Sequence, residues 1–420
     1  MDKFFICGGN KLLGEVDIMS SKNAVLPILA GCILCKGKVV IHKFPKFEDT
    51  KNMLKILEHL GANYKYENDS VVIDCSSFCV HDIPTNLGSK LRSSIFSLGS
   101  ILSRFKKAKV AYPGGCNIGA RPIDLHLKGL RSLGVKIIEK HGYIYCNGEN
   151  MKSGVITLDF PSVGATENLI LASVFLKGTT YIINSAKEPE IVDLANFLNT
   201  LGARVTGAGT SVIQIDGVEQ LRGGEYTPIG DRIIAGTYII ATCMCGGSVQ
   251  LNNIDPKNLV SLISKVKNSS CKIHTNRDKI QVIANGKPKS IAKVETRPFP
   301  GFPTDLQPQI VAMLSVAKGT SVVVENLFES RFRHTMELKK LGADIITKDN
   351  TAIIKGVAKL YGAEVDAFDL RGGAGLVLAG LVSEGYTTVN NVEHIDRGYF
   401  EMEKDLQKLG ANIERITTKA

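Results

Sequence analysis

A short glycine triplet that recurs along the chain restricts its possible folds more than any other feature. Leu-Gly-Ala, or Leu-Gly-Val, occurs at 60–62, 133–135, 201–203, 341–343 and 409–411, and a degenerate copy lies at 269–271. A glycine directly after a helix commonly takes the left-handed conformation that ends it. The copies are spaced by roughly 70 residues and six such units account for the 420-residue chain, so we expect a repeat architecture.

The elements around each triplet follow one order. A Gly or Ala and a β-branched strand come first, as at 178–183, and an amphipathic helix follows. In one such helix Ile191, Leu194 and Leu198 lie at positions i, i+3 and i+7, which places them on one face. A second short strand comes after the triplet, as at 344–346. Each unit therefore contains strands of a sheet and a surface helix.

A second helix, apolar on nearly all sides, precedes each of these segments. A helix without a polar face should be buried, and six buried helices exceed one core of ordinary size. We therefore predict an α/β fold of two domains with three units each, in which the helices lie inside and the sheets outside. The six buried helices are predicted at 24–35, 93–104, 165–176, 236–245, 306–317 and 372–383.

The charge balance favours an anionic ligand. There are 51 Lys and Arg against 41 Asp and Glu, a formal net charge of +10. The basic residues are spread along the chain and tryptophan is absent, which argues against a nucleic-acid-binding protein. No apolar run reaches the roughly 18 residues of a membrane span, and the start of the chain does not resemble a signal peptide. Ten cysteines without an export signal predict a reducing, cytoplasmic location.

Two closely spaced cysteine pairs raise the question of a metal or redox site. Cys32 with Cys35, and Cys243 with Cys245, both lie in apolar helical stretches without a histidine at ligand spacing. We therefore predict that these cysteines are small buried core residues.

Basic residues recur at the predicted starts of the buried helices. Lys22, Arg92, Arg232 and Arg371 occupy nearly the same position in four of the six units. A helix start already carries unpaired N–H groups and a positive dipole end, so a cation there is unfavourable unless an anion binds. The recurrence predicts that the helix starts converge on phosphate or carboxylate groups, although each residue taken alone can also be a solvated surface side chain.

A glycine-rich loop at 112–124 is the most unusual segment. It contains Cys116, and Arg121 follows five residues later, where it can lower the pKa of the thiol and hold an anion. The residues alone leave open whether Cys116 is a nucleophile, a proton donor or an incidental loop cysteine. We expect His126 to be structural rather than a catalytic partner.

A second candidate segment ends in a carboxylate. A proline-rich stretch at 298–303 leads into Asp305 at a helix start, where an aspartate can be a helix N-cap or a general base. Arg331 with Arg333, and the turn with Asp396 and Arg397, are further candidates for anion binding, with simple solvation as the alternative.

Together these segments resemble the UDP-N-acetylglucosamine 1-carboxyvinyltransferases, a family of enolpyruvyl transferases. The resemblance covers essentially the whole chain, and its motifs occur in order at 21–24, 92–93, 113–122, 162–166, 302–305, 369–371 and 394–398. It implies a two-domain inverse α/β barrel of three strand–helix units per domain, with the active site in the cleft between the domains. One domain is expected at 22–229 and the other at 1–21 plus 230–420.

The resemblance also implies a reaction. The enolpyruvyl group of phosphoenolpyruvate would pass to the 3-hydroxyl of UDP-N-acetylglucosamine by addition and elimination, with release of phosphate. This transfer is the first committed step of peptidoglycan synthesis. The two substrates are the expected partners of a monomeric enzyme, with no cofactor, metal or nucleic acid.

The site residues of the family carry over onto matching positions of this chain. Cys116 would be the acid, would form a covalent adduct with phosphoenolpyruvate and would be alkylated by fosfomycin, while Asp305 would be the base for the 3-hydroxyl. Arg331 and Arg371 are expected in the cleft. The positions that match the phosphoenolpyruvate site are Lys22, Asn23, Arg121 and Arg397. The positions that match the UDP-sugar site are Arg92, Arg121, Pro122, Ile123, Asp124, Leu125, Ser162, Val163, Gly164, Asp305 and Leu327.

The chain departs from the family pattern at 19–21, at Glu48 and at Ile234, where other residues are usual. Two alternatives from the same fold remain. A 5-enolpyruvylshikimate-3-phosphate synthase would share phosphoenolpyruvate, but the glycine-rich loop argues against it. A catalytically silent paralogue that binds the UDP-sugar is opposed by the presence of both Cys116 and Asp305.

Overall fold

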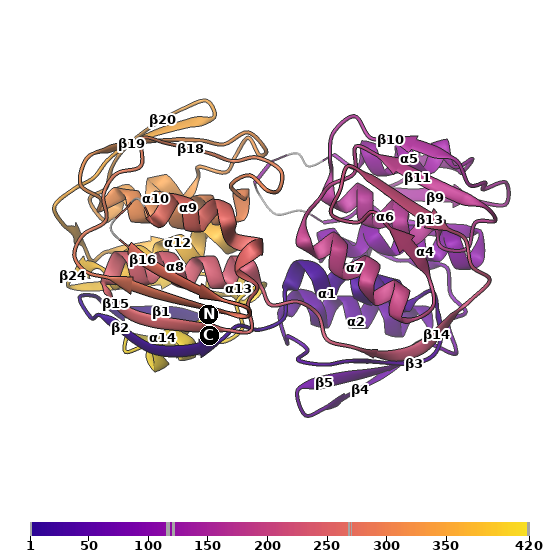
Figure 1. Cartoon of the computed structure of the whole chain (residues 1–420), viewed down its shortest axis with the longest axis horizontal. Helices are drawn as coiled ribbons and strands as arrows, with labels where there is room; N and C mark the ends of the chain where they lie inside the picture. Colours follow the sequence, from indigo (N-terminus) through magenta and orange to yellow (C-terminus); the bar gives the residue numbers. More distant parts are fainter. Residues whose placement is uncertain (1, 115–117, 120–121, 268, 270, 418–420) are drawn as a thin grey trace. The chain divides into compact units, whose positions relative to one another are not determined.

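The computed structural model of the chain describes residues 2–114, 118–119, 122–267, 269 and 271–417. The chain folds into two compact units, which are described separately below. Unit 1 comprises residues 1–19, 117–120 and 230–420, and unit 2 comprises residues 20–116 and 121–229 (Figure 1). The assignment of these units to the predicted transferase domains stays a prediction, as does the predicted cleft.

The sheets of unit 2 share one topology. In each of them the first strand runs parallel to the second, and the remaining pairs are antiparallel. The first sheet has the strand order β14 (Leu221–Tyr226), β3 (Cys35–Ile41), β5 (Ser70–Asp74) and β4 (Asn63–Glu67). The second has the order β6 (Asp82–Ile83), β7 (Lys107–Ala111), β9 (Tyr143–Asn147) and β8 (Lys136–Lys140). The third has the order β10 (Val155–Thr157), β11 (Thr179–Ile183), β13 (Val212–Asp216) and β12 (Arg204–Thr206).

Unit 1 repeats this topology, and the N-terminal strands β1 and β2 complete two of its sheets. The first of its sheets has the strand order β2 (Leu12–Asp17), β15 (Gly247–Asn252), β17 (Lys279–Ala284) and β16 (Cys271–Asn276). The second has the order β18 (Lys293–Glu295), β19 (Thr320–Val324), β21 (Thr351–Lys355) and β20 (Asp344–Lys348). The third has the order β23 (Glu364–Asp366), β25 (Tyr386–Asn390), β1 (Asp2–Cys7) and β26 (Asn412–Thr417). A short pair, β22 (Leu360–Tyr361) and β24 (Ser383–Glu384), runs parallel.

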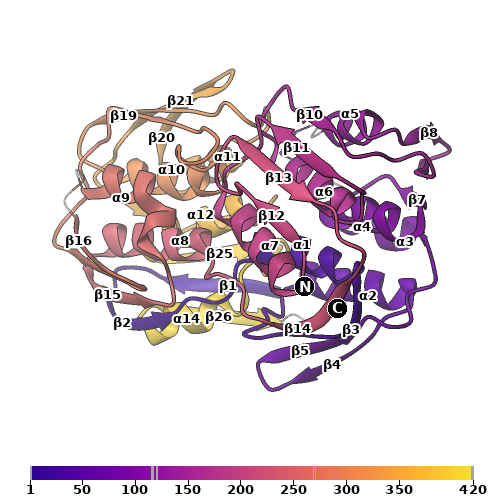
Figure 2. The same cartoon turned by 45° about the vertical axis from the view of Figure 1, so that its right-hand side comes forward.

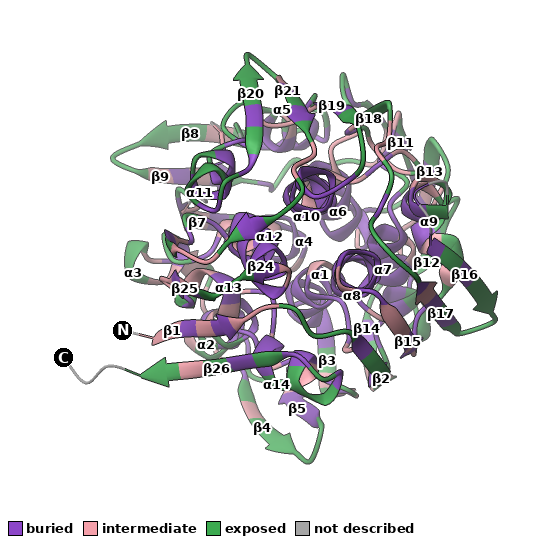
Figure 3. Ribbon diagram, turned by 90° about the vertical axis from the view of Figure 1, so that its left-hand side faces the viewer, coloured by how far each residue is buried: buried purple, intermediate pink, exposed green. Residues whose placement is uncertain are grey.

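The helices fall into a buried and a more exposed set, as predicted. Nearly every side chain of the first set is buried, because these helices are apolar on all sides, whereas the second set is amphipathic. Figure 2 shows the first set enclosed within its sheets, and Figure 3 shows it in purple with green outer strands. The buried helices are α1 (Lys22–Cys32), α4 (Phe96–Phe105) and α6 (Val163–Ser173) in unit 2, and α8 (Arg232–Cys245), α10 (Gln307–Ser315) and α12 (Leu370–Leu381) in unit 1. The second set is α2 (Glu48–Leu60), α5 (Asp124–Ser132), α7 (Pro189–Thr200), α9 (Val260–Lys267), α11 (His334–Lys340) and α14 (Met402–Lys408).

Short helical turns complete the chain. They are α3 (Thr85–Gly88), α13 (Glu393–Asp396), η1 (Arg92–Ile95), η2 (Pro256–Leu259) and η3 (Thr304–Leu306). Within the part of the chain that the structure describes, no helix has both the length and the apolar character to cross a bilayer.

The recurring triplet ends helices as predicted. The glycines of all five well-formed copies have φ between 90° and 114°, the left-handed conformation in which a Cβ is unfavourable. These glycines are Gly61, Gly134, Gly202, Gly342 and Gly410. The degenerate copy follows α9, but its residue 270 lies outside the described residues.

The predicted bounds of the buried helices were wrong by a few residues. α1 ends at Cys32 rather than at residue 35, because Cys35 already pairs in β3. α8 begins at Arg232, four residues before the prediction, because the side chain of Asp231 accepts hydrogen bonds from the amides of Ile233 and Ile234 and starts the helix there.

The cysteines agree with the prediction except at two sites, Cys243 and Cys245, of which Cys245 is only half-buried. Cys32 and Cys35 are fully buried core residues, and burial raises the pKa of the Cys35 thiol. Cys243 is also fully buried, but its sulfur forms a disulfide with that of Cys271. The expectation of a plain core cysteine was wrong at Cys243. Strand β16, which carries Cys271, pairs with β17, and β17 packs on α8. This packing brings Cys271 against Cys243, which lies 28 residues earlier in the chain.

Candidate functional site

Asp305 lies in η3, directly before the buried helix α10. The N-cap of η3 is Pro303, so the alternative that Asp305 is an N-cap was wrong. Its carboxylate instead accepts hydrogen bonds from two buried arginines. Arg331 Nη2 lies 3.1 Å from Asp305 Oδ1, and Arg371 Nη2 lies 3.1 Å from Asp305 Oδ2. The Asp305 side chain keeps 27% exposure, so this carboxylate is both fixed and accessible.

Arg331 is almost completely buried between the loop that carries it and η3. Its Nε and Nη2 atoms donate to the carbonyl oxygen of Thr304, at 3.3 and 3.1 Å. Its Nη1 atom lies 3.5 Å from Asp369 Oδ1. A guanidinium group with several fixed acceptors has little freedom, and Arg331 therefore sets the direction of the Asp305 carboxylate.

Asp369 connects this cluster to a helix start. Its Oδ1 atom accepts hydrogen bonds from the amides of Arg371 and Gly372, both at 3.0 Å, and so caps α12. The cap fixes the first turn of α12, which carries Arg371. Burial alone would lower the pKa of the Arg371 guanidinium, but the charge of Asp305 and the phenol of Tyr399 raise it, and the net shift is upward.

A buried histidine supports the same cluster. His334 Nδ1 donates to the carbonyl oxygen of Arg331 at 3.0 Å. Burial, opposed by the charge of Asp369 and reinforced by that of Arg331, lowers the pKa of His334 to about 4. The imidazole is therefore neutral at pH 7 and adds no further charge beside the two arginines.

Arg397 follows the short helix α13, in the turn predicted to bind anions. The structure gives a different role to the acid of that turn. Asp396 forms a bidentate ion pair with Arg415, at 2.7 and 2.9 Å, and Arg415 also binds Glu403 and Asp2. Asp396 therefore anchors the turn to β26, while Arg397 is half-buried at its end.

In unit 2, Lys22 begins helix α1 and is 8% exposed. Its ammonium group lies 2.7 Å from Asp49 Oδ2, and Asp49 is itself buried. The ion pair offsets the cost of a cation at a helix start and holds its position. The neighbouring Asn23 is half-buried, as is Arg92 in η1.

Two of the predicted UDP-sugar segments meet within unit 2. Ser162 caps α6 by accepting a hydrogen bond from the amide of Ala165 at 3.3 Å, which places Val163 and Gly164 in the first turn. A Cβ on Gly164 would lie 3.1 Å from the Phe96 ring and 3.2 Å from the His126 ring. The start of α6 therefore lies against α5 and α4. Of the other segment, Ile123 is buried, Leu125 is half-buried, and Pro122 and Asp124 are exposed.

Leu327 lies in a loop of unit 1 that Glu325 ties to η3. Glu325 is 2% exposed; its Oε1 accepts from the Leu327 amide at 2.9 Å, and its Oε2 accepts from the hydroxyl of Thr304 at 2.9 Å. This carboxylate couples the loop of Leu327 to the turn that presents Asp305.

Cys116 and Arg121, the predicted acid and anion-binding arginine, lie outside the described residues. Between them, Ile118 is described, and its carbonyl oxygen accepts a hydrogen bond from the Ser330 amide at 3.1 Å within unit 1.

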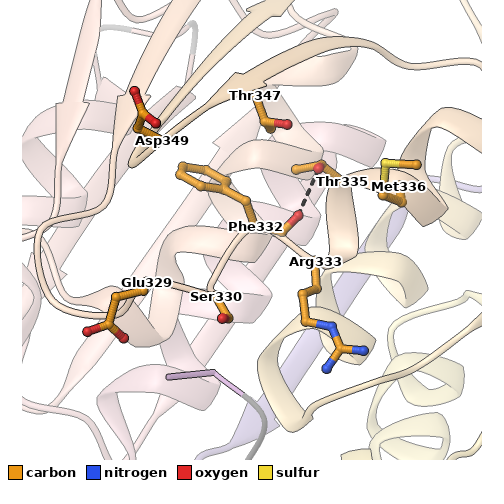
Figure 4. Close-up of a pocket in the computed structure, with 8 residues that line it drawn as sticks. All are labelled: Glu329, Ser330, Phe332, Arg333, Thr335, Met336, Thr347 and Asp349. Carbon is orange, nitrogen blue, oxygen red and sulfur yellow. Dashed lines mark hydrogen bonds between the residues drawn. The ribbon is translucent and has the colours of Figure 1, made fainter. Parts of the chain in front are cut away.

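A shallow cavity of about 250 Å³ lies beside the start of α11, lined by eight residues including Glu329, Phe332 and Asp349 (Figure 4). The Arg333 guanidinium and the Glu329 carboxylate point in different directions there. Of its lining residues, Arg333 is one of the arginines predicted to bind anions, and none of the others is a predicted site residue.

Sequence reasoning missed several residues that support the site. Asp49, Glu325, His334 and Tyr399 stand far in the sequence from the side chains they contact, and no local pattern marks them. Asp369 carried a detectable signal, because it precedes a buried helix and an arginine as Asp231 does.

Known proteins resemble this chain over its full length. Residues 6–406 match the family model described as EPSP synthase (3-phosphoshikimate 1-carboxyvinyltransferase). The UDP-N-acetylglucosamine 1-carboxyvinyltransferase 2 of Caldanaerobacter subterraneus subsp. tengcongensis is 51% identical over 416 residues, 99% of this chain and 100% of that protein. The UDP-N-acetylglucosamine 1-carboxyvinyltransferase 2 of Clostridium tetani is 46% identical over 99% of this chain and 100% of that protein.

Solved structures resemble it in fold. The enolpyruvyl transferase NikO from Streptomyces tendae has a TM-score of 0.88 at 24% identity and covers 100% of this chain and 99% of its own. EPSP synthase from Acinetobacter baumannii has a TM-score of 0.77 at 18% identity, with 99% and 100% covered. These likenesses confirm the predicted inverse α/β architecture. The full-length identity to curated relatives goes further, and the chain belongs to the UDP-N-acetylglucosamine 1-carboxyvinyltransferases within the EPSP synthase family.

Proposed function

We propose that this chain transfers the enolpyruvyl group of phosphoenolpyruvate to the 3-hydroxyl of UDP-N-acetylglucosamine and releases phosphate. The observation that carries this function is the identity of 46–51% to proteins of that name over 98–99% of the chain. The product would be UDP-N-acetylglucosamine-enolpyruvate, which enters peptidoglycan synthesis. The expected cytoplasmic location and monomeric state belong to this proposal and are tested by cell fractionation and light scattering.

Asp305 is the base in this proposal. It takes the proton of the sugar 3-hydroxyl as the hydroxyl oxygen attacks C2 of phosphoenolpyruvate, while C3 receives a proton. Two guanidinium groups hold the carboxylate in one orientation. Correct orientation toward the hydroxyl proton is the first requirement of a general base. The exposed part of the Asp305 side chain leaves room for the hydroxyl.

Cys116 supplies the proton to C3 in this proposal, on the strength of the family resemblance. The addition gives a tetrahedral phospho-ketal. The Cys116 thiolate then takes a proton back from C3 as the C2–O bond to phosphate breaks, and the leaving phosphate takes the proton held by Asp305, which restores the vinyl group and both side chains. Lys22, Arg121 and Arg397 would hold the phosphate and carboxylate charges during both steps.

The function is tested by phosphate release from purified protein with phosphoenolpyruvate and one acceptor at a time. We expect release with UDP-N-acetylglucosamine and none with shikimate 3-phosphate. Release with shikimate 3-phosphate alone would move the chain to the sister reaction, and UDP-sugar binding without release would support the silent paralogue.

The role of Asp305 is tested by Asp305→Asn. The amide keeps hydrogen-bonding capacity but cannot accept the hydroxyl proton, so we expect kcat to fall by about 10²–10⁴-fold, with UDP-sugar binding within a few-fold of wild type. Asp349→Asn, an exposed acid at a β-turn in the same unit, is the matched control and should keep full activity. A kcat for Asp305→Asn within tenfold of wild type would remove Asp305 from the proton transfer.

A further inference from the structure

A buried polar network joins three elements of unit 1 behind Asp305. Tyr399 follows α13 and is 1% exposed. Its hydroxyl lies 2.8 Å from Thr237 Oγ1 on α8 and accepts a hydrogen bond from Gln309 Nε2 on α10 at 3.0 Å. Gln309 Nε2 also lies 3.1 Å from Thr237 Oγ1. Buried hydroxyl groups are costly unless they are paired, so these hydrogen bonds fix the position of the Tyr399 ring.

The ring of Tyr399 in turn packs against Arg371. The Arg371 Cζ atom lies 5.4 Å from the ring centroid, within the range of a cation–π contact. Burial raises the pKa of the Tyr399 hydroxyl, although the charge of Arg371 opposes the shift. The phenol is therefore neutral at pH 7 and acts as a hydrogen-bonding group.

The guanidinium of Arg371 is held by Asp305 and by Tyr399, whose hydroxyl also forms a side-chain hydrogen bond with it. Its Nη2 atom donates to Asp305, but its Nε and Nη1 atoms are buried without a hydrogen-bond partner among the described residues. Charge interactions reach it from Asp305 and Asp231, and these do not fix its orientation. The Tyr399 ring therefore restricts where the guanidinium can lie.

We propose that Tyr399 is a positioning residue, which fixes Arg371 and through it the Asp305 carboxylate. The inference deepens the proposed function, because it concerns the residue assigned as the base. Rotation of the Arg371 guanidinium would break its hydrogen bond to Asp305 Oδ2, while the bond from Arg331 to Asp305 Oδ1 would remain. A shift of about 1 Å in a reacting group is enough to cost a large factor in rate.

The test compares Tyr399→Phe with wild type in two measurements. Phenylalanine keeps the ring but removes the hydroxyl that anchors it to Thr237 and Gln309. The first measurement is the titration of the Asp305 carboxyl carbon by NMR, assigned with Asp305→Asn. We expect the Asp305 titration midpoint to move upward by half a pH unit or more, because a looser Arg371 stabilises the carboxylate less, while Arg331 still contacts it. The second is the steady-state rate, with kcat expected to fall about tenfold and both KM values to stay within twofold.

Tyr238→Phe is the matched control. Tyr238 is another buried tyrosine, on α8, and its hydroxyl donates to Asp405 Oδ2 at 2.9 Å rather than to the network. It should lose stability as Tyr399→Phe does, with no change in the Asp305 titration or in kcat. If Tyr399→Phe does not fold, Thr237→Val removes the same anchor and should shift the Asp305 titration in the same direction.

The two measurements separate the failure of this inference from that of the proposed function. An unshifted Asp305 titration in Tyr399→Phe, or an equal shift in Tyr238→Phe, would overturn the positioning role even if the wild-type enzyme is active. A wild-type protein without phosphate release would overturn the function, while a shifted titration would still establish the link between Tyr399 and Asp305.

Discussion

At the residue scale, two helices can pack closely where a single glycine replaces a larger residue at their contact. Gly99 of α4 faces Asn168 of α6, whose Oδ1 atom accepts a hydrogen bond from the Gly99 amide at 2.7 Å. A Cβ at residue 99 would lie 2.2 Å from the Asn168 carbonyl oxygen, a backbone atom that cannot easily move. The glycine is therefore required by packing and not by its conformation.

We expect Gly99→Ala to lower the free energy of unfolding by about 1–3 kcal/mol. The gain of about 1 kcal/mol in helix propensity is smaller than the cost of separating α4 from α6. Gly154→Ala is the control, since nothing lies within 4 Å of its Cβ, and it should change stability by less than about 0.5 kcal/mol. Urea denaturation of both variants checks this, and equal stabilities would contradict the close contact.

At the element scale, buried titratable groups give individual helices their own pH dependence. Asp193 of α7 is 2% exposed, and burial raises its pKa to about 6, although hydrogen bonds from Tyr226 and the Ile229 amide oppose the shift. His334 of α11 shows the opposite case, with its pKa lowered to about 4. Burial disfavours the charged form of both groups. The charged form of Asp193 is the deprotonated one, so its pKa rises, whereas the charged form of His334 is the protonated one, so its pKa falls.

These two groups predict stability slopes of opposite sign. The folded chain binds more protons at Asp193 between pH 4 and 6, so the stability of wild type relative to Asp193→Asn should fall by about 2.4 kcal/mol from pH 4 to 7. The unfolded chain binds more protons at His334 between pH 4 and 6.5, so the stability of wild type relative to His334→Gln should rise by about 3 kcal/mol over that range. Denaturant titrations at four pH values measure both, and slopes of the same sign would refute the assignment.

At the scale of the whole molecule, the six four-stranded sheets in the described part of the chain have equivalent strand orders, so one strand–helix plan builds both units. The plan leaves each buried helix with its N-terminal end near a charged or polar residue. In unit 1 the starts of α10 and α12 meet through Asp305 and Arg371. The predicted gathering of helix starts on anions stays a prediction, but this contact brings two of them together.

A substrate that binds the folded chain should stabilise it. With UDP-N-acetylglucosamine at about 100 times its dissociation constant, we expect the free energy of unfolding to rise by about 2.7 kcal/mol. Shikimate 3-phosphate at the same concentration should leave the thermal midpoint unchanged. Thermal denaturation with each compound checks this; an equal rise with both would count against selective recognition of the UDP-sugar.

Periodicity and spacing were sufficient to predict the repeat, the buried helices and the glycine caps, because these depend on contacts between residues close in the sequence. The residues that complete the site come from elsewhere in the chain. Lys22 pairs with Asp49, Arg331 and Arg371 converge on Asp305, and Asp396 is held by Arg415. Local patterns cannot show which distant side chains meet.

The sequence by itself therefore determined the secondary structure, the fold class and the types of residue at the helix starts. The tertiary structure decided which charges are paired and which side chains are held in place. It made Asp305 a fixed carboxylate between two arginines instead of a helix cap, and it joined Cys243 to Cys271. The physical reason is that amphipathic patterns act over one or two helical turns, whereas ion pairs and buried hydrogen bonds depend on how separate elements pack.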